Sequence, residues 1–405
     1  MCRYALLFLL ACGPVFSAPN PLVREAVQFA LWHSGDSRER RTINEVLAGA
    51  QRSRPGLSVV AEGHPGTDPY RQMQLWCKTG AAGVPDIVVL RDQWLPDFAA
   101  FLEPLNARLY ATDLRNIPEA VRSRLRFAGN LYGVPWQVNT FALYYRPDLL
   151  DAAGMLPPRT WEELLICARR VHNPPEVYGF GLPGNLDGGA AEALLQMLWS
   201  YGTDLPGLDR PSALPAEVLS RCLQLYSDLH AVAEPEVLSW SQDALEDHFL
   251  KGKLAMIVAD RTFRDRLEAQ TSAPKWAVTS LPAGTSSAGR LTVDVACVFK
   301  SSTHREAAAH VLRCLTTFEA VTGLTKVGSV PFHTDLVRDL RLDPLQAAFS
   351  ANLEQSRGLP LQRWPSARDA FSEGLVYLLS GRMSVAEAAD LIQKRLAEGE
   401  APHTP

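Results

Sequence analysis

The chain has 405 residues, a length that suits two domains better than one. Apolar residues make up 47% of it and charged residues 21%, a balance that can bury a sizeable core. The net charge of −4 is too small to indicate binding to nucleic acid or to an anionic membrane surface, so both partners are excluded from the prediction.

The first seventeen residues have the pattern of a secretory signal peptide. Arg3 precedes an apolar stretch over 4–11, and the small residues Val15 and Ser17 predict cleavage after Ser17. An alternative is a lipoprotein signal in "LLAC", in which Cys12 would become the lipidated first residue. No later stretch reaches the roughly 20 apolar residues of a membrane span. The sequence therefore predicts a periplasmic or other extracytoplasmic protein, either free or anchored through Cys12.

The elements after the signal alternate between strand and helix. "AVQFALW" predicts a strand, and Asp36 or Ser37 opens a helix that Pro55-Gly56 ends. "LSVVAEG" is the next strand, and Asp68-Pro69 opens the second helix. "PDIVVL" is apolar throughout, as expected for a strand covered on both faces. This alternation predicts a parallel sheet wrapped by helices.

A second α/β unit follows. Thr160 and Glu163 form a capping box at the start of a helix, and Ser384 and Glu387 form another. The strands expected here are "LAMIVA", "WAVTSLP" and "LTVDVACVF". The remaining helices are expected over 188–201, 215–232, 303–321, 344–355, 366–380 and 384–397.

Local signatures of enzymes and metal sites are absent from the sequence. It has no GxSxG, HExxH, Walker or GxGxxG motif, and its histidines lack metal-ligand spacing. The five cysteines beyond residue 12 lie at least seventeen residues apart, so they are interpreted as small buried hydrophobes. We therefore predict no catalytic residue, no metal and no cofactor. A glycosidase carboxylate pair would carry no local motif, so that alternative stays open.

Tyr144-Tyr145 raises a question of its own, because adjacent tyrosines bind ferric iron in some periplasmic proteins. Neighbouring strand residues point to opposite faces, and these two close an apolar strand. Packing in the core is the preferred interpretation.

Seven pieces of sequence, in order, resemble one family. They are "GVPDIVVL", "FLEPL", "NLYGVPWQVNTFALYYRPDLLDAAGMLPPRTWEELLICARRV…YGFGLPG", "FLKGKLAMIVAD" with "SLPAG", "GSVPFHTD" and "LSGRMSVAEAADLIQKRL". The run is similar to the extracellular solute-binding proteins of carbohydrate ABC importers, the maltose-binding-protein-like group. Two places depart from the family pattern: Asp260-Arg261 and Val293-Asp294 stand where glycines are usual. The resemblance therefore does not identify a particular sugar as the ligand.

The resemblance implies an α/β fold of two lobes, each a mostly parallel sheet flanked by helices, with a ligand cleft between them. It implies chain crossings near 138–142, near 293–295 and just after Pro331. Lobe 1 would then comprise 18–138 and 295–332, and lobe 2 would comprise 139–294 and 333–398. Residues 1–17 would be the signal peptide and 399–405 a disordered tail.

Candidate ligand contacts lie just past strand ends and at the first crossing, where "GVP" turns the chain toward the cleft. Aromatic rings cover the C–H faces of a sugar, and paired polar groups bond its hydroxyl rim. Candidates before residue 140 are Asp36, Asp92, Gln93, Trp94, Trp136, Gln137 and Asn139. Later candidates are Trp199, Trp240, Asp260, Arg261, Asp294, Trp364 and Arg368. Asp92 has the alternative role of capping the next element. Trp76 and Trp161 fit helix stripes and are predicted to be core.

The implied function is that of a receptor. Closure of the lobes around a mono- or oligosaccharide would present it to the subunits of an ABC permease, with the receptor acting as a monomer. Arg261 and Arg368 motivate a second hypothesis, an anionic ligand such as a glycerol phosphodiester. A glycoside-processing enzyme is the third.

Overall fold

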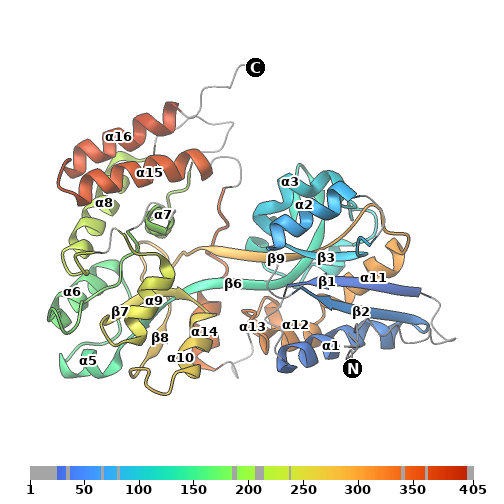
Figure 1. The fold of residues 1–405 in the computed structure, drawn as a ribbon. Helices are drawn as coiled ribbons and strands as arrows, with labels where there is room; N and C mark the ends of the chain where they lie inside the picture. The colour runs from blue at the N-terminus through green and yellow to red at the C-terminus, as the bar shows by residue number, and fades with distance from the viewer. Residues whose placement is uncertain are drawn as a thin grey trace, which may run out of the picture.

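The computed structural model describes residues 25–32, 37–64, 68–79, 83–184, 189–205, 214–236, 239–338, 343–360 and 364–398. The predicted signal peptide, Cys12, Asp36 and the tail 399–405 lie outside these ranges. Two lobes stand side by side in Figure 1, and the long strands β6 and β9 run from one into the other. The α/β, two-lobed fold class predicted from the sequence is confirmed.

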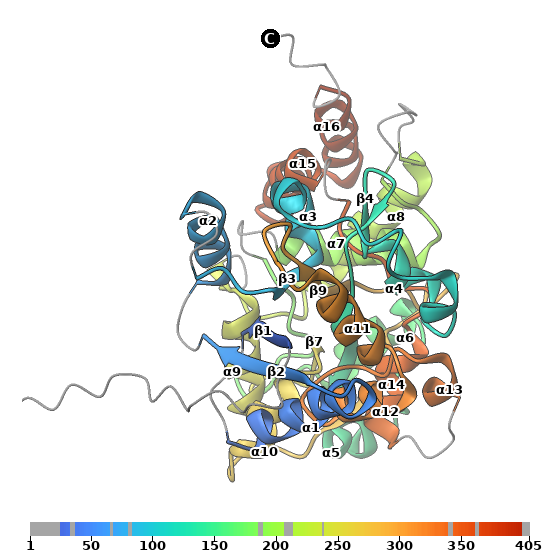
Figure 2. The same cartoon turned by 90° about the vertical axis from the view of Figure 1, so that its right-hand side faces the viewer.

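Lobe 1 begins with the predicted alternation of strand and helix. Its elements here are β1 (Glu25–Leu31), α1 (Ser37–Ser53), β2 (Leu57–Gly63), α2 (Pro69–Thr79) and β3 (Ile87–Arg91). β1 pairs in parallel with both β2 and β3. In Figures 1 and 2, α2 lies on one side of these strands and α1 on the other. The buried run of β3 is thus covered on both faces, as its composition predicts.

Short elements that follow β3 and helices from later in the chain complete lobe 1. The short elements are η1 (Asp92–Trp94), α3 (Leu95–Phe98), η2 (Ala99–Phe101), η3 (Ala111–Asp113), α4 (Glu119–Ser123), β4 (Arg126–Phe127) and β5 (Asn130–Leu131). The later helices are α11 (Arg305–Leu315), α12 (Phe318–Thr325) and α13 (Thr334–Val337).

The single helix predicted over 303–321 is wrong, because the structure has two helices there. α11 ends at Leu315, and the hydroxyl of Thr317 then accepts a hydrogen bond from the backbone N–H of Ala320 at the start of α12. Threonine is a good N-cap because its side chain satisfies an amide that has no partner in the first turn. The apolar periodicity continues through this break and hides it.

Lobe 2 has more helix and fewer strands. Its helices are α5 (Pro147–Ala152), α6 (Trp161–Val171), α7 (Gly189–Ser200), α8 (Ala216–His230), α9 (Gln242–Leu250), α10 (Phe263–Ala269), α14 (Pro344–Ala351), α15 (Trp364–Leu379) and α16 (Val385–Glu398). β7 (Met256–Asp260) and β8 (Ala277–Thr279) both pair antiparallel with β6. The predicted capping box forms at Ser384, whereas at Thr160 only half of it forms: the Thr160 hydroxyl accepts from the N–H of Glu163, and the Glu163 carboxylate accepts from the N–H of Arg159 instead of Thr160.

One continuous sheet joins the lobes. β6 (Gly133–Tyr145) pairs with β9 (Leu291–Val298) in lobe 1 and with β7 and β8 in lobe 2. β9 runs against the other strands of lobe 1, and β6 runs against β7 and β8 in lobe 2. Lobe 1 therefore keeps the mostly parallel character that was predicted, with β9 as its reversed strand, whereas in lobe 2 both named strands that pair with β6 are antiparallel to it.

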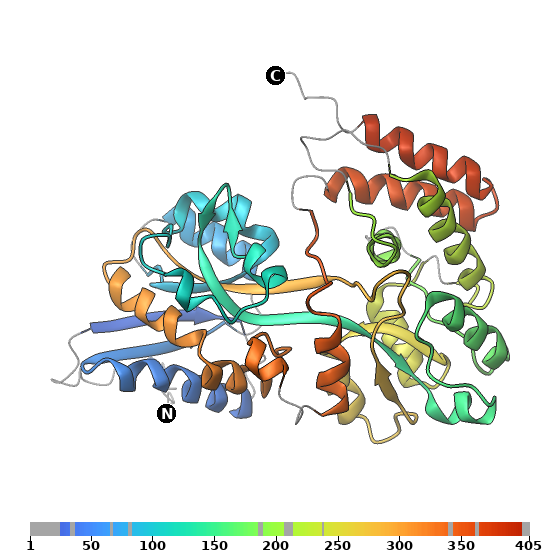
Figure 3. The ribbon, with the colours of Figure 1, turned by 180° about the vertical axis from the view of Figure 1, so that it is seen from behind.

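Another segment packs beside these two strands. The segment 352–360 rises between the lobes in Figure 3, from α14 toward α15. Asn352 is fully buried and ties three parts of the hinge together. Its amide donates to the carbonyl of Phe141 at 3.0 Å, and its Oδ1 accepts from the hydroxyl of Ser287 at 2.5 Å.

Separate apolar cores fix each lobe. One buried cluster contains β1, β3, β9 and α11, and two others fill lobe 2. Leu336 of α13 belongs to the first cluster, so we propose that the last crossing into lobe 2 falls after Val337, later than the resemblance implies. The other lobe boundaries given above stay as proposed. Cys77, Cys167, Cys222, Cys297 and Cys314 are all free.

Tyr144 lies in the core of lobe 2, as preferred above. Its side chain is fully buried, and its hydroxyl donates to the carbonyl of Asp260 at 3.0 Å. Burial raises the pKa of Tyr144 far above the ordinary phenol value, which keeps the group neutral.

Candidate ligand-binding site

A cleft of about 800 Å³ lies where the two lobes meet. β6 and β9 form its base, the end of β7 and α10 form the lobe 2 side, and α1 with the end of α12 form the lobe 1 side. Five predicted contacts line it: Gln137, Asn139, Asp260, Arg261 and Asp294. Charged residues that were not predicted line it as well: Glu39, Arg91, Arg264, Asp265, Glu268, Arg290 and Lys326.

A β-bulge decides which side chains of β6 face the cleft. Pro135 pairs with Val295 and Gln137 pairs with Asp294, so Trp136 is an extra residue in the ladder. Beyond the bulge, the half-buried residues Gln137, Asn139 and Phe141 alternate with buried ones and line the cleft. The bulge therefore determines which alternate residues of β6 form the cleft wall.

Trp136 itself points the other way. Only 3% of its surface is exposed, and its ring packs on Phe29 in the core of lobe 1 at 5.1 Å between centroids. It is not among the described residues that line the cleft, which corrects its placement on the cleft wall. An apolar tryptophan at a bulge gains more from core packing than from an open polar wall.

Asp294 is the acidic residue that β9 contributes to the floor of the cleft. It pairs across the sheet with Arg91 at the end of β3 and with Gln137 on β6. Burial raises the pKa of Asp294 from 3.8 to about 6, the positive charge of Arg91 lowers it, and the negative charge of Asp92 raises it. Asp294 therefore changes its charge close to neutral pH.

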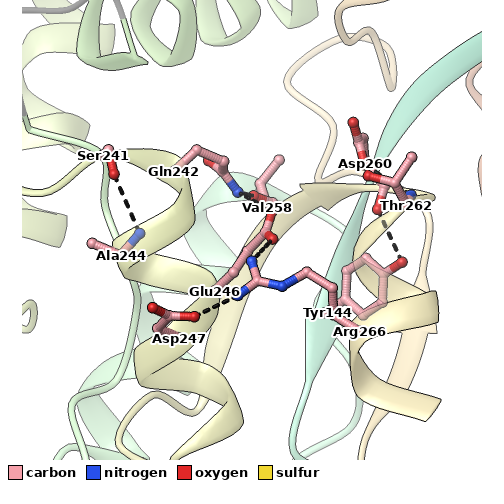
Figure 4. A network of polar contacts seen from close by, with 10 residues as sticks. All are labelled: Tyr144, Ser241, Gln242, Ala244, Glu246, Asp247, Val258, Asp260, Thr262 and Arg266. Atoms are coloured by element: carbon pink, nitrogen blue, oxygen red, sulfur yellow. Dashed lines mark hydrogen bonds and ion pairs between the residues drawn. The ribbon is translucent and has the colours of Figure 1, made fainter. Parts of the chain in front are cut away.

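The end of β7 presents Asp260 and Thr262. Asp260 Oδ1 accepts hydrogen bonds from the N–H of Thr262 at 2.8 Å and from its hydroxyl at 2.5 Å. Figure 4 shows this turn beside the network that holds β7 in place. There, Gln242 of α9 donates to the carbonyl of Val258 at 3.1 Å, and Arg266 of α10 bonds two acids of α9. These hydrogen bonds hold β7 and α10 against α9, and so fix the position of the lobe 2 residues that line the cleft.

Arg261 spans the hinge from lobe 2 to lobe 1. Its side chain is 5% exposed, and Nη2 donates to the carbonyl of Thr325 at the end of α12 over 3.4 Å. Its backbone N–H donates to Oδ1 of Asn139 at 3.3 Å, and Nε has no hydrogen-bond partner among the described residues. Burial lowers the pKa of the guanidinium. An under-bonded buried cation beside a cleft is a candidate for polar contact with a ligand.

α10 and the residue before β9 supply further charges. Arg264, Asp265 and Glu268 share one face of α10, and Arg264 pairs with Glu268 at 2.7 Å. Arg290 pairs with Glu192 of α7, and burial raises the pKa of Glu192. Arg290 also lines a smaller cavity of about 100 Å³ inside lobe 2.

The other predicted tryptophans lie away from the cleft wall. Trp199 is buried in lobe 2, where its N–H donates to Asp204 at 2.8 Å, and Trp240 is buried against His248 at 3.9 Å. Trp364 opens α15 and packs half-buried against the lobe 2 core. Trp94 is half-buried beside Tyr70, with the Arg91 guanidinium 5.8 Å from its ring centroid.

Three predicted polar residues also lie elsewhere. Asp92 is buried and forms a 2.5 Å ion pair with Arg124, so its carboxylate faces into lobe 1. Gln93 is half-buried in η1 and is not among the described lining residues. Arg368 pairs with its neighbour Asp369 on α15 at 2.9 Å. The last residue of β3, Arg91, takes the cleft position predicted for Asp92, because successive residues at a strand end face opposite sides.

Within the described ranges, no group of three or more His, Cys, Asp or Glu side chains could hold a metal ion. None of the helices described there combines the length and the apolar character needed to cross a membrane.

Comparisons with known proteins agree with this geometry. A family model for bacterial extracellular solute-binding proteins matches residues 34–321. A binding protein of Brucella abortus (strain 2308) is 27% identical over 370 residues, covering 87% of this chain and 89% of that protein.

Two solved structures share the fold. The cyclic alpha-maltosyl-1,6-maltose binding protein of Arthrobacter globiformis has a TM-score of 0.78 at 20% identity, over 93% of this chain and 99% of that one. An ABC transporter solute-binding protein of Thermotoga lettingae, bound with alpha-D-tagatose, has a TM-score of 0.72 at 20% identity, over 93% and 100%. Because the family model spans well over half of the sequence, the chain belongs to the bacterial extracellular solute-binding proteins.

Proposed function

We propose that this protein is the receptor of an ABC importer and binds a sugar or oligosaccharide between its lobes. The observation that carries the proposal is a cleft whose polar wall comes from both lobes and from the strands that join them. A ligand that contacts both lobes would favour the closed form. We further propose that the receptor is a monomer outside the cytoplasm, that it hands the ligand to a membrane permease, and that it has no catalytic role.

The charges of the cleft favour a neutral ligand. Its described lining has five basic side chains (Arg91, Arg261, Arg264, Arg290 and Lys326) and five acidic ones (Glu39, Asp260, Asp265, Glu268 and Asp294). A phosphodiester would gain no net attraction from such a wall, whereas hydroxyl groups both donate and accept. The balance therefore supports a sugar over the anionic alternative.

The test is titration of the purified protein with a broad sugar panel, followed by tryptophan fluorescence and thermal unfolding. A sugar at one hundred times its Kd should stabilise the folded state by about 2.7 kcal/mol. A panel that moves neither signal would refute the sugar assignment.

Glycerol phosphodiesters form a second arm, in which Arg261→Ala should abolish binding if the ligand is an anion. Recovery of the bound sugar unchanged tests the absence of catalysis.

Ligand affinity should depend on pH through Asp294. We expect the ionised carboxylate to accept a ligand hydroxyl, so a pKa of about 6 makes binding roughly tenfold weaker at pH 5 than at pH 7.5. In Asp294→Asn, binding should be weak and independent of pH over this range. Calorimetric titrations of both proteins at the two pH values measure the effect. A pH dependence that survives in Asp294→Asn would assign the titration to another group.

The same shift has a consequence for stability. Since the folded pKa lies above the ordinary value of 3.8, the folded state holds the proton more tightly than the unfolded chain. This group alone therefore makes the free energy of unfolding fall as the pH rises from about 4 to about 6.

A further inference from the structure

The cleft wall is poor in aromatic rings. Phe141 is the one Trp, Tyr or Phe among the described residues that line it, against ten charged side chains. Ligand pockets are ordinarily lined mostly by apolar and aromatic groups with a few polar ones. Here the proportion is reversed, which limits the kinds of sugar that this wall can hold.

Other rings near the cleft are already engaged. Trp136 is buried against Phe29, and Trp94 is covered by Tyr70 and the Arg91 guanidinium. Trp32, at the end of β1, donates to the carbonyl of Val89 at 2.7 Å and packs against Trp76. The internal segments outside the described ranges contain no Trp, Tyr or Phe in the sequence. The shortage of rings is therefore a property of the chain between residues 25 and 398.

The smaller cavity of lobe 2 does not supply the missing rings. Phe141 and Arg290 line both this cavity and the main cleft, and Trp161 and Phe180 line the smaller cavity alone. Both of these side chains are at least 97% buried, and the Trp161 N–H donates to Ser200 at 2.9 Å. Neither ring offers an open face, and a volume of about 100 Å³ is small for a second sugar unit.

The charged groups suit a dense set of hydroxyls. Arg91 lies beside Asp294, Arg264 bonds Glu268, and Asp260 lies beside Arg261, so donors and acceptors alternate along the wall. A pair of adjacent hydroxyls can accept from a guanidinium and donate to a carboxylate at once. An extended oligosaccharide would need a ring surface for each further unit, because each unit has apolar C–H faces to cover.

We infer that the ligand is a single polyhydroxylated unit, a monosaccharide or its reduced alditol, and not an oligosaccharide. This inference rests on the proposed function. One ring, Phe141, suffices to cover one face of one pyranose, and an open-chain alditol needs no ring at all. The wall between residues 137 and 141 of β6 would then be the main specificity surface.

Calorimetric titration with hexoses, hexitols, maltotriose and maltotetraose tests the inference. We expect at least one hexose or hexitol to bind at least tenfold more tightly than either oligosaccharide. An oligosaccharide that binds tenfold more tightly than every single unit would overturn the inference and leave the proposed function standing. A panel in which no sugar binds would overturn both.

Two variants test the role of the ring. Phe141→Ala should weaken binding of a cyclic hexose roughly tenfold and leave a hexitol within twofold, because only the cyclic ligand has a face to cover. The matched control is Phe101→Ala, an exposed ring of η2 outside the cleft, which should change neither affinity. An equal loss for hexose and hexitol in Phe141→Ala would show that the ring acts through structure and would overturn its assigned role.

Discussion

Asp92→Ala is expected to lower the free energy of unfolding by roughly 3–5 kcal/mol and to leave sugar affinity nearly unchanged. Asp92 and Arg124 form a 2.5 Å ion pair with 6% and 15% of their side-chain surfaces exposed. Arg124 also donates to the carbonyl of Leu359 at 3.2 Å and packs over Gly358 in the segment 352–360. Removing the carboxylate would leave this guanidinium buried without its counter-charge.

Urea denaturation of the variant measures the effect. Arg124→Ala should show a loss of similar size, and the double variant should lose less than the two single losses added together. Glu119→Ala is the control, because its pair with Arg122 is largely exposed and should contribute less than about 1 kcal/mol. If Asp92→Ala kept its stability and lost sugar binding, Asp92 would be a ligand contact after all.

Gly133→Ala is expected to destabilise the protein by roughly 3 kcal/mol or more. A Cβ at this position would lie 2.2 Å from the carbonyl oxygen of Ala296 and 2.6 Å from Cγ1 of Val295. Both contacts belong to β9 in the middle of the joined sheet, where the backbone has little freedom to move. The clash would therefore separate β6 from β9 at the lobe 1 end of the two crossing strands.

Thermal and urea unfolding of Gly133→Ala check this prediction, with Gly49→Ala as the matched control. Gly49 lies inside α1, and the nearest atom to a Cβ there is the Arg52 guanidinium at 3.8 Å. Alanine favours the helix, so the control should gain up to about 1 kcal/mol. Equal stability of Gly133→Ala and the unsubstituted protein would contradict the close approach of β6 and β9.

The fold was predictable because periodicity reports burial. The apolar run of β3, the alternation at the start of the chain, the N-cap at Thr160 and the capping box at Ser384 each follow local rules. The break at Thr317 was missed because it interrupts the hydrogen bonds of the helix and leaves its apolar spacing intact. Local sequence patterns thus identify helices and strands more reliably than they identify the boundaries between them.

The site was predictable only in part. Asp260, Arg261 and Asp294 were found as charged residues at positions where the family has glycine, and Gln137 and Asn139 were found at a strand that leaves a turn. Arg91 was missed because its exposure depends on which way the last residue of β3 faces. Arg264 and Lys326 reach the cleft only through tertiary packing, for which the sequence carries no local signal.

The tryptophans were misplaced for a different reason. Trp136 follows a turn and precedes polar residues, which is typical of a binding loop, yet the bulge turns it inward. Only the residue type indicates Trp199 and Trp240 as ligand contacts, and both rings pack in the core of lobe 2. Residue type predicts what a side chain could do, and the register of the strand decides what it contacts.

The extra residue at position 136 also shows where this strand can absorb a change of length. Without Trp136, Pro135 would still lie opposite Val295 and Gln137 opposite Asp294, so the ladder would become regular and the same side chains of β6 would line the wall. The insertion is contained at the bulge, and the pairing beyond it fixes which side chains a ligand meets.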